Sequence, residues 1–295
     1  MDQLDVSLLN RTPAQPAGIG VRLSAMPRDV LDDPFGAVDA VARPVGPRFI
    51  GHVAVASHEN LVAIGHVTDH ELEVWCGSAD QLTRVTAFAA PVPAGGLVSL
   101  IHHRDEWHLL ARCERGRSWH LVSDDLCRWT HLSQVVSSFP SFAVSGAAVR
   151  DGDLLLAGSV FVDKTAFGWG LLRSDGRNFE ARPVPLPLAT QFGVVGPVLD
   201  GHGDAVLLLD SGENRTVARS TGRGWMLSLL APDITPVSGF ADGDDVWMAG
   251  HDNATGDPAL ARVSSDHVIS LPRAGLGRVR SASVHRDHLV VASEC

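Results

Sequence analysis

Six polar residues occupy equivalent places in this sequence, each directly after a short apolar run. They are His66, Arg112, Ser159, Asp210, His251 and Glu294. A histidine that titrates near neutrality beside a carboxylate can take up and release a proton at physiological pH. An arginine can hold a carboxylate or a phosphate with two parallel hydrogen bonds. These residue types therefore predict acid–base chemistry on a small-molecule substrate.

Three neighbouring repeats of the chain supply the candidate catalytic residues. The expected catalytic set is His66, His251, Glu294 and His52, where His52 begins the strand that leads into the His66 repeat. The residues expected to bind the substrate are Arg280, Arg112, Asp210, Glu114, Asp252 and Lys164. For any one of these residues a polar loop facing water is the alternative explanation, because loops that leave strands are usually solvated.

The same histidines also suit a metal ion, because three imidazole nitrogens and one carboxylate are a ligand set that Zn²⁺ or Fe²⁺ accepts. No local spacing such as H-x-x-x-H enforces that arrangement, and the phosphate-loop, dinucleotide and serine-hydrolase motifs are absent. We therefore expect no cofactor. A divalent metal held by His52, His66, His251 and Glu294 is the alternative.

A repeat in the sequence explains how residues so far apart can meet. Six tight polar turns end at positions 60, 106, 153, 204, 245 and 288, at intervals of 41 to 51 residues. Each turn joins a strand of small residues, such as 53–56, to a more apolar strand, such as 61–65. One hairpin per unit at this period indicates a β-propeller, a ring of small sheets whose strands are buried between neighbouring blades.

The last repeat has only two strands before Cys295, and the start of the chain supplies a match for the rest. Residues 20–24 resemble the third strand of a unit, and residues 38–45 are expected to be the fourth. We therefore predict an all-β, six-bladed β-propeller closed by N- and C-terminal strands that share one blade. It is expected to be a single domain over 1–295, with residues 1–50 completing the blade begun by 280–295. Residues 25–37 are expected to be an insertion with a short helix.

Short hairpins after the third strand of several units combine a serine, an aspartate or glycine, and an aromatic residue. They begin at Ser123, Ser174 and Ser220 and end at Trp129, Phe179 and Trp225. These stretches resemble the Asp-box hairpins of the sialidase-like β-propeller superfamily and the S-x-D-L-x-x-W hairpins of five-bladed glycosidases. The resemblance implies a structural role, in which Ser and Asp side chains bond turn amides and the aromatic residue packs between blades. It also implies glycan chemistry, but sialidases use a tyrosine nucleophile and this chain has no Tyr, so ordinary sialidase activity is not expected.

The composition argues against several classes of partner. A net charge of −10 without any basic run disfavours nucleic acid. The sequence has no run of 18 apolar residues and no apolar leader at its start, so we expect neither a membrane span nor secretion. The cysteines at positions 76, 113, 127 and 295 show neither C-x-x-C spacing nor a disulfide-dense pattern. They are expected to be free thiols of a cytoplasmic protein.

Three functions fit these observations. The first is a cytoplasmic propeller enzyme that uses acid–base chemistry in its central mouth, as a lyase, isomerase or cyclase of natural-product or sugar metabolism. The second is a glycoside hydrolase-like enzyme with paired carboxylates, in which Glu294 works with Asp210, Glu114 or Glu213. The third is a non-enzymatic propeller that binds glycans or other proteins. The residues at the strand ends favour the first function, and the sequence leaves the oligomeric state open.

Overall fold

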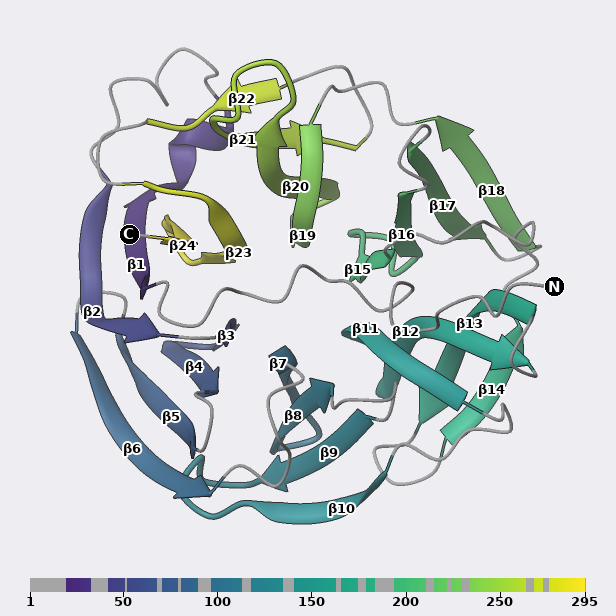
Figure 1. Ribbon diagram of the computed structural model, residues 1–295, viewed down its shortest axis with the longest axis horizontal. Helices are drawn as coiled ribbons and strands as arrows, with labels where there is room; N and C mark the ends of the chain where they lie inside the picture. The colour runs from purple at the N-terminus through teal and green to yellow at the C-terminus, as the bar shows by residue number, and fades with distance from the viewer. Residues whose placement is uncertain are drawn as a thin grey trace, which may run out of the picture.

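The structure is a computed structural model that describes residues 20–32, 42–50, 52–67, 71–78, 81–89, 97–112, 118–134, 141–162, 166–174, 179–183, 194–210, 215–221, 224–229, 234–263, 268–272 and 276–294. The strands in these ranges form six four-stranded sheets. Neighbouring strands within each sheet run antiparallel. The sheets stand side by side round a ring (Figure 1). The predicted all-β propeller is therefore confirmed.

Five of the sheets are each built from four consecutive strands. One sheet contains β3 (His52–His58), β4 (Leu61–Val67), β5 (Glu71–Ser78) and β6 (Gln81–Ala89). The next contains β7 (Leu97–His103), β8 (Glu106–Arg112), β9 (Ser118–Ser123) and β10 (Thr130–Gln134). It is followed by β11 (Ser141–Arg150), β12 (Asp153–Val162), β13 (Ala166–Ser174) and β14 (Phe179–Pro183). Then come β15 (Val194–Leu199), β16 (Ala205–Asp210), β17 (Arg215–Thr221) and β18 (Gly224–Leu229). The fifth contains β19 (Ile234–Asp242), β20 (Asp245–Asp252), β21 (Pro258–Arg262) and β22 (Val268–Ser270).

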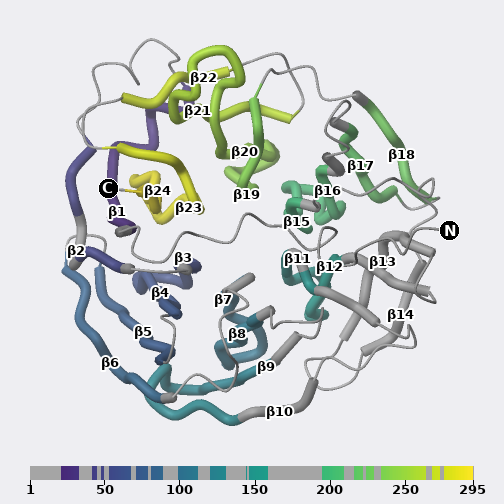
Figure 2. The backbone as a smooth tube through the Cα atoms, in the orientation of Figure 1, coloured from purple at the N-terminus to yellow at the C-terminus, as the bar shows by residue number. Residues whose placement is uncertain are grey.

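The sixth sheet combines both ends of the chain, and we call it the shared sheet. Its strands are β23 (Val279–His285), β24 (His288–Glu294), β1 (Gly20–Pro27) and β2 (Arg43–Ile50), in the order β2-β1-β24-β23. β1 pairs antiparallel with β24, from Val21 opposite Glu294 to Pro27 opposite His288. Figure 2 shows the purple N-terminal strands lying beside the yellow C-terminal ones. This is the arrangement that the incomplete last repeat predicted.

The first fifty residues differ from the prediction in one boundary. The outermost strand of the shared sheet is β2, at Arg43–Ile50, so the prediction of a strand over 38–45 was wrong by about five residues. Residues 33–41 lie outside the described ranges. The helix expected within 25–37 is the 3₁₀ segment η1 (Arg28–Leu31). At four residues, this helical segment of the described chain is far too short to cross a membrane.

The core lies between neighbouring sheets, as the continuous apolar strands predict. On one face of the shared sheet, Leu289 and Val291 pack with Trp247 of the β19–β22 sheet. On the other face, Val290 and Ala292 pack with residues of the β3–β6 sheet. Every side chain of β24 from 289 to 293 is buried. The shared sheet therefore contacts both neighbours through buried apolar side chains, and this fixes the position of the strand ends beyond them.

The innermost strands are crowded, which explains their small residues. Gly146 of β11 lies against β15 of the next sheet. A Cβ atom added at Gly146 would stand 1.8 Å from the carbonyl oxygen of Gly196. Only a residue without a side chain fits at this crossing.

Residues in or near the hairpin turns between first and second strands contact the neighbouring sheets round one end of the ring. The contacts, in chain order, are the His58–His102 ring stack (centroids 3.6 Å apart), the hydrogen bond from Arg104 Nε to Gly152 O (2.8 Å), the ion pair of Arg150 with Asp204 (3.8 Å), the close approach of Gly201 to Asp244, the ion pair of Arg28 with Asp242 (2.5 Å) and the hydrogen bond from Ser57 Oγ to Val284 O (3.2 Å). Each of these joins two neighbouring sheets. The polar side chains at the turn end of the ring are thus used by the fold itself.

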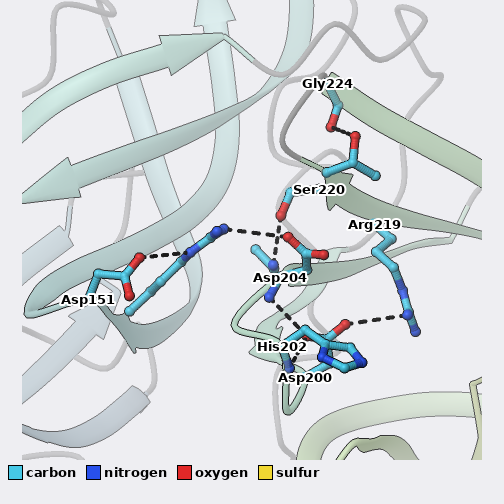
Figure 3. A network of polar contacts seen from close by, with 10 residues as sticks. Asp151, Asp200, His202, Asp204, Arg219, Ser220 and Gly224 are labelled. Carbon is cyan, nitrogen blue, oxygen red and sulfur yellow. Dashed lines mark hydrogen bonds and ion pairs between the residues drawn. The ribbon is translucent and has the colours of Figure 1, made fainter.

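The turn of the β15–β18 sheet shows how such contacts hold a buried carboxylate in place (Figure 3). Asp200 Oδ1 accepts hydrogen bonds from the backbone N–H groups of His202 (3.0 Å) and Asp204 (2.9 Å). Its other oxygen lies 3.3 Å from Nη1 of Arg219, and the side chain is only 1% exposed. Ser220, one of the serines that end a third strand, accepts a hydrogen bond from Ala205 N at 2.7 Å. These residues stabilise a turn and are not available for catalysis.

The Asp-box-like hairpin at residues 123–129 has the structural role that the resemblance implied. Asp125 Oδ1 accepts hydrogen bonds from the backbone N–H groups of Cys127 and Arg128, both at 2.8 Å. These two bonds, that of Arg128 first, lower the pKa of the Asp125 carboxyl. Trp129 donates to the carbonyl of Leu126 at 2.9 Å and packs on the core between the β3–β6 and β7–β10 sheets. The hairpin therefore anchors an aromatic side chain between two blades.

Candidate active site

The strand ends opposite the turns contain the residues that the sequence singled out. β20 ends at Asp252, β24 ends at Glu294 and β23 begins at Val279, seven residues from its turn. Seven extended residues span roughly 20 Å, so these ends are well separated from the ring of turn contacts. β23 is the strand of the shared sheet nearest the centre of the ring (Figure 1). Residues at the start of β23 therefore lie at the opposite mouth.

Arg280 and Glu294 form an ion pair at this mouth. Nη2 of Arg280 donates a hydrogen bond to Oε1 of Glu294, and the two side chains are 21% and 15% exposed. The pairing register of β23 with β24 shifts between Val279 and Ser281, so Arg280 sits at a β-bulge outside the regular ladder. Bulges redirect a side chain in this way, and here it turns the guanidinium toward the last residue of β24.

His251 of β20 lies beside this ion pair, across the boundary between two sheets. Burial lowers the pKa of its imidazole, and the positive charges of Arg278 and Arg280 lower it further. A hydrogen bond to the backbone of Val279 and the negative charge of Glu294 act in the opposite direction. Nδ1 is buried and has no hydrogen-bond partner in the described chain, so we assign the bond to Val279 to Nε2. The ring is therefore neutral at pH 7, with the lone pair of Nδ1 unused.

The cluster of His251, Arg278, Arg280 and Glu294, which we call the mouth cluster, has an unbalanced charge. Arg278 is exposed and takes part in no ion pair with another described residue. With His251 neutral, two arginines and one carboxylate leave a net charge of +1. This occurs in a chain whose overall charge is −10. A local excess of positive charge on an acidic protein favours an anionic ligand.

His66 belongs to a second polar cluster, between the shared sheet and the β3–β6 sheet. Its Nδ1 lies 3.1 Å from Oε2 of Glu73, the residue opposite it on β5. Glu73 also accepts hydrogen bonds from Trp75 Nε1 (3.1 Å) and Arg84 Nη1 (3.0 Å). Burial tends to raise the pKa of the Glu73 carboxyl, but the bonds from His66, Trp75 and Arg84 outweigh it and hold the pKa low. The His66 ring packs on Phe49 of the shared sheet, with ring centroids 5.1 Å apart.

The structure thus joins three of the predicted site residues and gives a fourth a different partner. His251, Arg280 and Glu294 lie together at the mouth. The sequence left open whether His66 or His251 works with Glu294. In the structure the carboxylate beside His66 is Glu73, because the pairing of β4 with β5 places these two residues opposite each other. The register of β4 with β5, in which residue 66 faces residue 73, was the signal for Glu73.

The other predicted residues do not add to the mouth cluster in the described part of the chain. Asp252 uses Oδ1 to accept the N–H groups of Ala254 (2.9 Å) and Thr255 (2.8 Å), which lowers the pKa of its carboxyl and orders its own loop. The side chains of His52, Arg112 and Asp210, and the whole of Glu114 and Lys164, lie outside the described residues. Among the residues that are described, no three of His, Cys, Asp and Glu are arranged to hold a metal ion.

Comparisons with known proteins identify the fold and no closer relationship. No protein-family model and no curated protein matches the chain. Solved structures that it resembles include an exo-β-1,3-galactanase from Phanerochaete chrysosporium with galactose (11% identity over 75% of this chain and 66% of that one, TM-score 0.49). They also include a putative gluconolactonase (11%, 83% and 89%, TM-score 0.52) and a nidogen/laminin complex (10%, 93% and 100%, TM-score 0.54).

These neighbours include β-propeller glycosidases and gluconolactonase-like propellers. The chain spans just under two thirds of the galactanase. Identities near a tenth show a shared architecture and no shared activity, since one propeller fold carries many unrelated functions.

Proposed function

We propose that this protein is an enzyme that acts on a small molecule, with His251 as its general base. The observation that supports the proposal is the meeting of a neutral histidine, whose Nδ1 has no partner among the described residues, with the Arg280–Glu294 ion pair from the adjacent sheet. A histidine with a lowered pKa keeps its lone pair at neutral pH and can accept a proton from the substrate. It can then return that proton at another atom of the same molecule.

The two arginines would stabilise the negative charge that develops on the substrate when the proton leaves. Charged donors held in place before the reaction are effective because they need no reorganisation. Glu294 accepts a hydrogen bond from Arg280, so its role in this proposal is to hold the guanidinium in position. Proton removal, charge stabilisation and proton return are the requirements of a lyase, an isomerase or a cyclase. The proposed reaction needs no cofactor. The expectations that the protein uses no cofactor and is cytoplasmic rest on the sequence.

A glycoside hydrolase-like activity is the second candidate, and Glu294 is the observation that favours it. Hydrolysis of a glycosidic bond needs two carboxyl groups that face each other across the substrate. Glu294 supplies one carboxylate at the mouth, while Glu73 is occupied by His66, Trp75 and Arg84. The proposed partners Asp210, Glu114 and Glu213 stay predictions of the sequence.

The test is a screen of sugars, lactones, aryl glycosides and hydroxy acids in D₂O, followed by proton NMR. We expect at least one compound to be converted or to exchange a proton for deuterium. The variant His251→Gln should lose this activity by about a hundredfold or more. His202→Gln, which changes an exposed histidine in the turn of another sheet, is the matched control. Equal activity in His251→Gln and the parent would contradict the proposal, and aryl glycoside cleavage alone would favour the second candidate.

A further inference from the structure

The mouth cluster has two unmatched polar atoms whose chemistry defines a ligand. Nδ1 of His251 and Nε of Arg280 are both buried side-chain atoms without a hydrogen-bond partner in the described chain. They belong to residues that interact electrostatically with each other. Buried polar atoms are nearly always paired, so each exception calls for a water, an ion or a ligand that the protein alone does not supply.

The unmatched atoms differ in kind. Nε of arginine carries a hydrogen and is always a donor, whereas Nδ1 of the neutral His251 ring is an acceptor. A molecule that satisfies both must present an acceptor to Arg280 and a donor to His251. A carboxylate next to a hydroxyl group does so, with a carboxylate oxygen on the guanidinium and the hydroxyl hydrogen on the imidazole.

The charge of the site favours the same class. The net charge of the mouth cluster is +1, which one carboxylate neutralises. A phosphate ester carries up to two negative charges and would leave the site with an excess negative charge. Exposed Arg278, without an ion-pair partner in the described residues, can contribute a second guanidinium to the carboxylate.

We propose that the mouth cluster binds a hydroxy acid, with the carboxylate on Arg278 and Arg280 and the hydroxyl on His251. The inference rests on the proposed function for the identity of the site, and it adds the chemical class of the substrate. It assigns binding roles to Arg278, which sequence reasoning did not select, and to Arg280.

The test is isothermal titration at pH 7.5 with four probes: D-gluconate, hexanoate, D-glucose and inorganic phosphate. They offer, respectively, a carboxylate with hydroxyls, a carboxylate alone, hydroxyls alone and a dianion. We expect D-gluconate to bind most tightly, with a Kd of about 1 mM or below, and to weaken as NaCl is added. Arg278→Gln should bind it about tenfold more weakly, because it loses one charged contact without breaking an ion pair.

Arg262→Gln is the matched control, because Arg262 pairs with Asp245 (2.7 Å) at the turn end of the neighbouring sheet. It should bind D-gluconate as the parent does. Equal affinity of Arg278→Gln and the parent, or tighter binding of phosphate, hexanoate or glucose than of gluconate, would overturn the inference. Binding is measured without turnover, so the two proposals can fail separately. A protein that binds gluconate but converts nothing supports this inference and contradicts the proposed function. His251-dependent turnover without carboxylate binding supports the proposed function and contradicts this inference.

Discussion

Replacing Glu73 by Gln should destabilise the protein by about 2 kcal/mol at pH 7. The carboxylate accepts three hydrogen bonds, from His66, Trp75 and Arg84. The Arg84 side chain is 53% exposed, so its ion pair contributes at most about 1 kcal/mol. The bonds from His66 and Trp75 are shielded from solvent. Both of these bonds end on Oε2, so a glutamine with its amide oxygen in that place can still accept them, but as bonds to a neutral group that are each about 1 kcal/mol weaker. The NH₂ group then faces Nη1 of Arg84, which loses its acceptor.

Urea denaturation followed by tryptophan fluorescence measures this loss. Glu71→Gln is the matched control, because Glu71 lies two residues earlier on the same strand with an exposed side chain. The pKa of Glu73 is lowered in the folded protein, so its stabilising contribution is complete above the ordinary carboxyl pKa of about 4.3 and is lost as the pH falls through the lowered value. The difference between parent and Glu73→Gln should therefore be full at pH 7 and shrink below about pH 4. If Glu73→Gln is no less stable than Glu71→Gln at pH 7, the pairing of His66 with Glu73 is refuted.

Two further predictions concern stability. The pKa values of His102, His251 and His285 are lowered, mainly by burial. The unfolded chain therefore binds more protons below about pH 6.5, and the free energy of unfolding should decrease from pH 6.5 downward by up to about 1.4 kcal/mol per pH unit for each histidine. Urea titrations between pH 7.5 and 5.5 check this, and a flat profile would show that these imidazoles titrate normally. Gly146→Ala should cost about 1–3 kcal/mol or prevent folding, because its Cβ would overlap the carbonyl oxygen of Gly196. Parent-like unfolding of that variant would mean that the β11–β15 crossing is looser than described.

The sequence was sufficient for the ring and for the residues that its hairpins align. Turn residues such as Asp151 and Gly152 mark each hairpin, and both have positive φ angles that suit a tight reversal. Because the turns are aligned, counting along strands of similar length placed His251, Arg280 and Glu294 at one end. The shared sheet followed from the two strands missing in the last repeat.

Two features could not be obtained in this way. The strand β2 contains Pro44, Gly46 and Pro47, which argue against a strand in a sequence. The strand forms because β2 is the outermost strand of its sheet, and a proline on its open side needs no hydrogen-bond partner. The register of β2 with β1 also shifts between Arg22 and Leu23, so the pairing is interrupted near the glycine and the second proline. Glu73 was missed for another reason: its role depends on the pairing of the second strand with the third, and the repeat aligns only the first hairpin of each unit.

The protonation state of His251 tests the central claim most directly. With ¹⁵N-labelled histidine, the imidazole signals can be assigned by comparing the parent with His251→Gln, and the two ring nitrogens can be followed from pH 8 to pH 5. We expect a neutral ring at pH 6.5, with the proton on Nε2, where the backbone of Val279 accepts it, and an unprotonated Nδ1. Addition of D-gluconate should shift the Nδ1 signal as a hydroxyl hydrogen bonds to it. A ring that is already positively charged at pH 6.5, or one with its proton on Nδ1, would contradict the assignment of His251 as a general base.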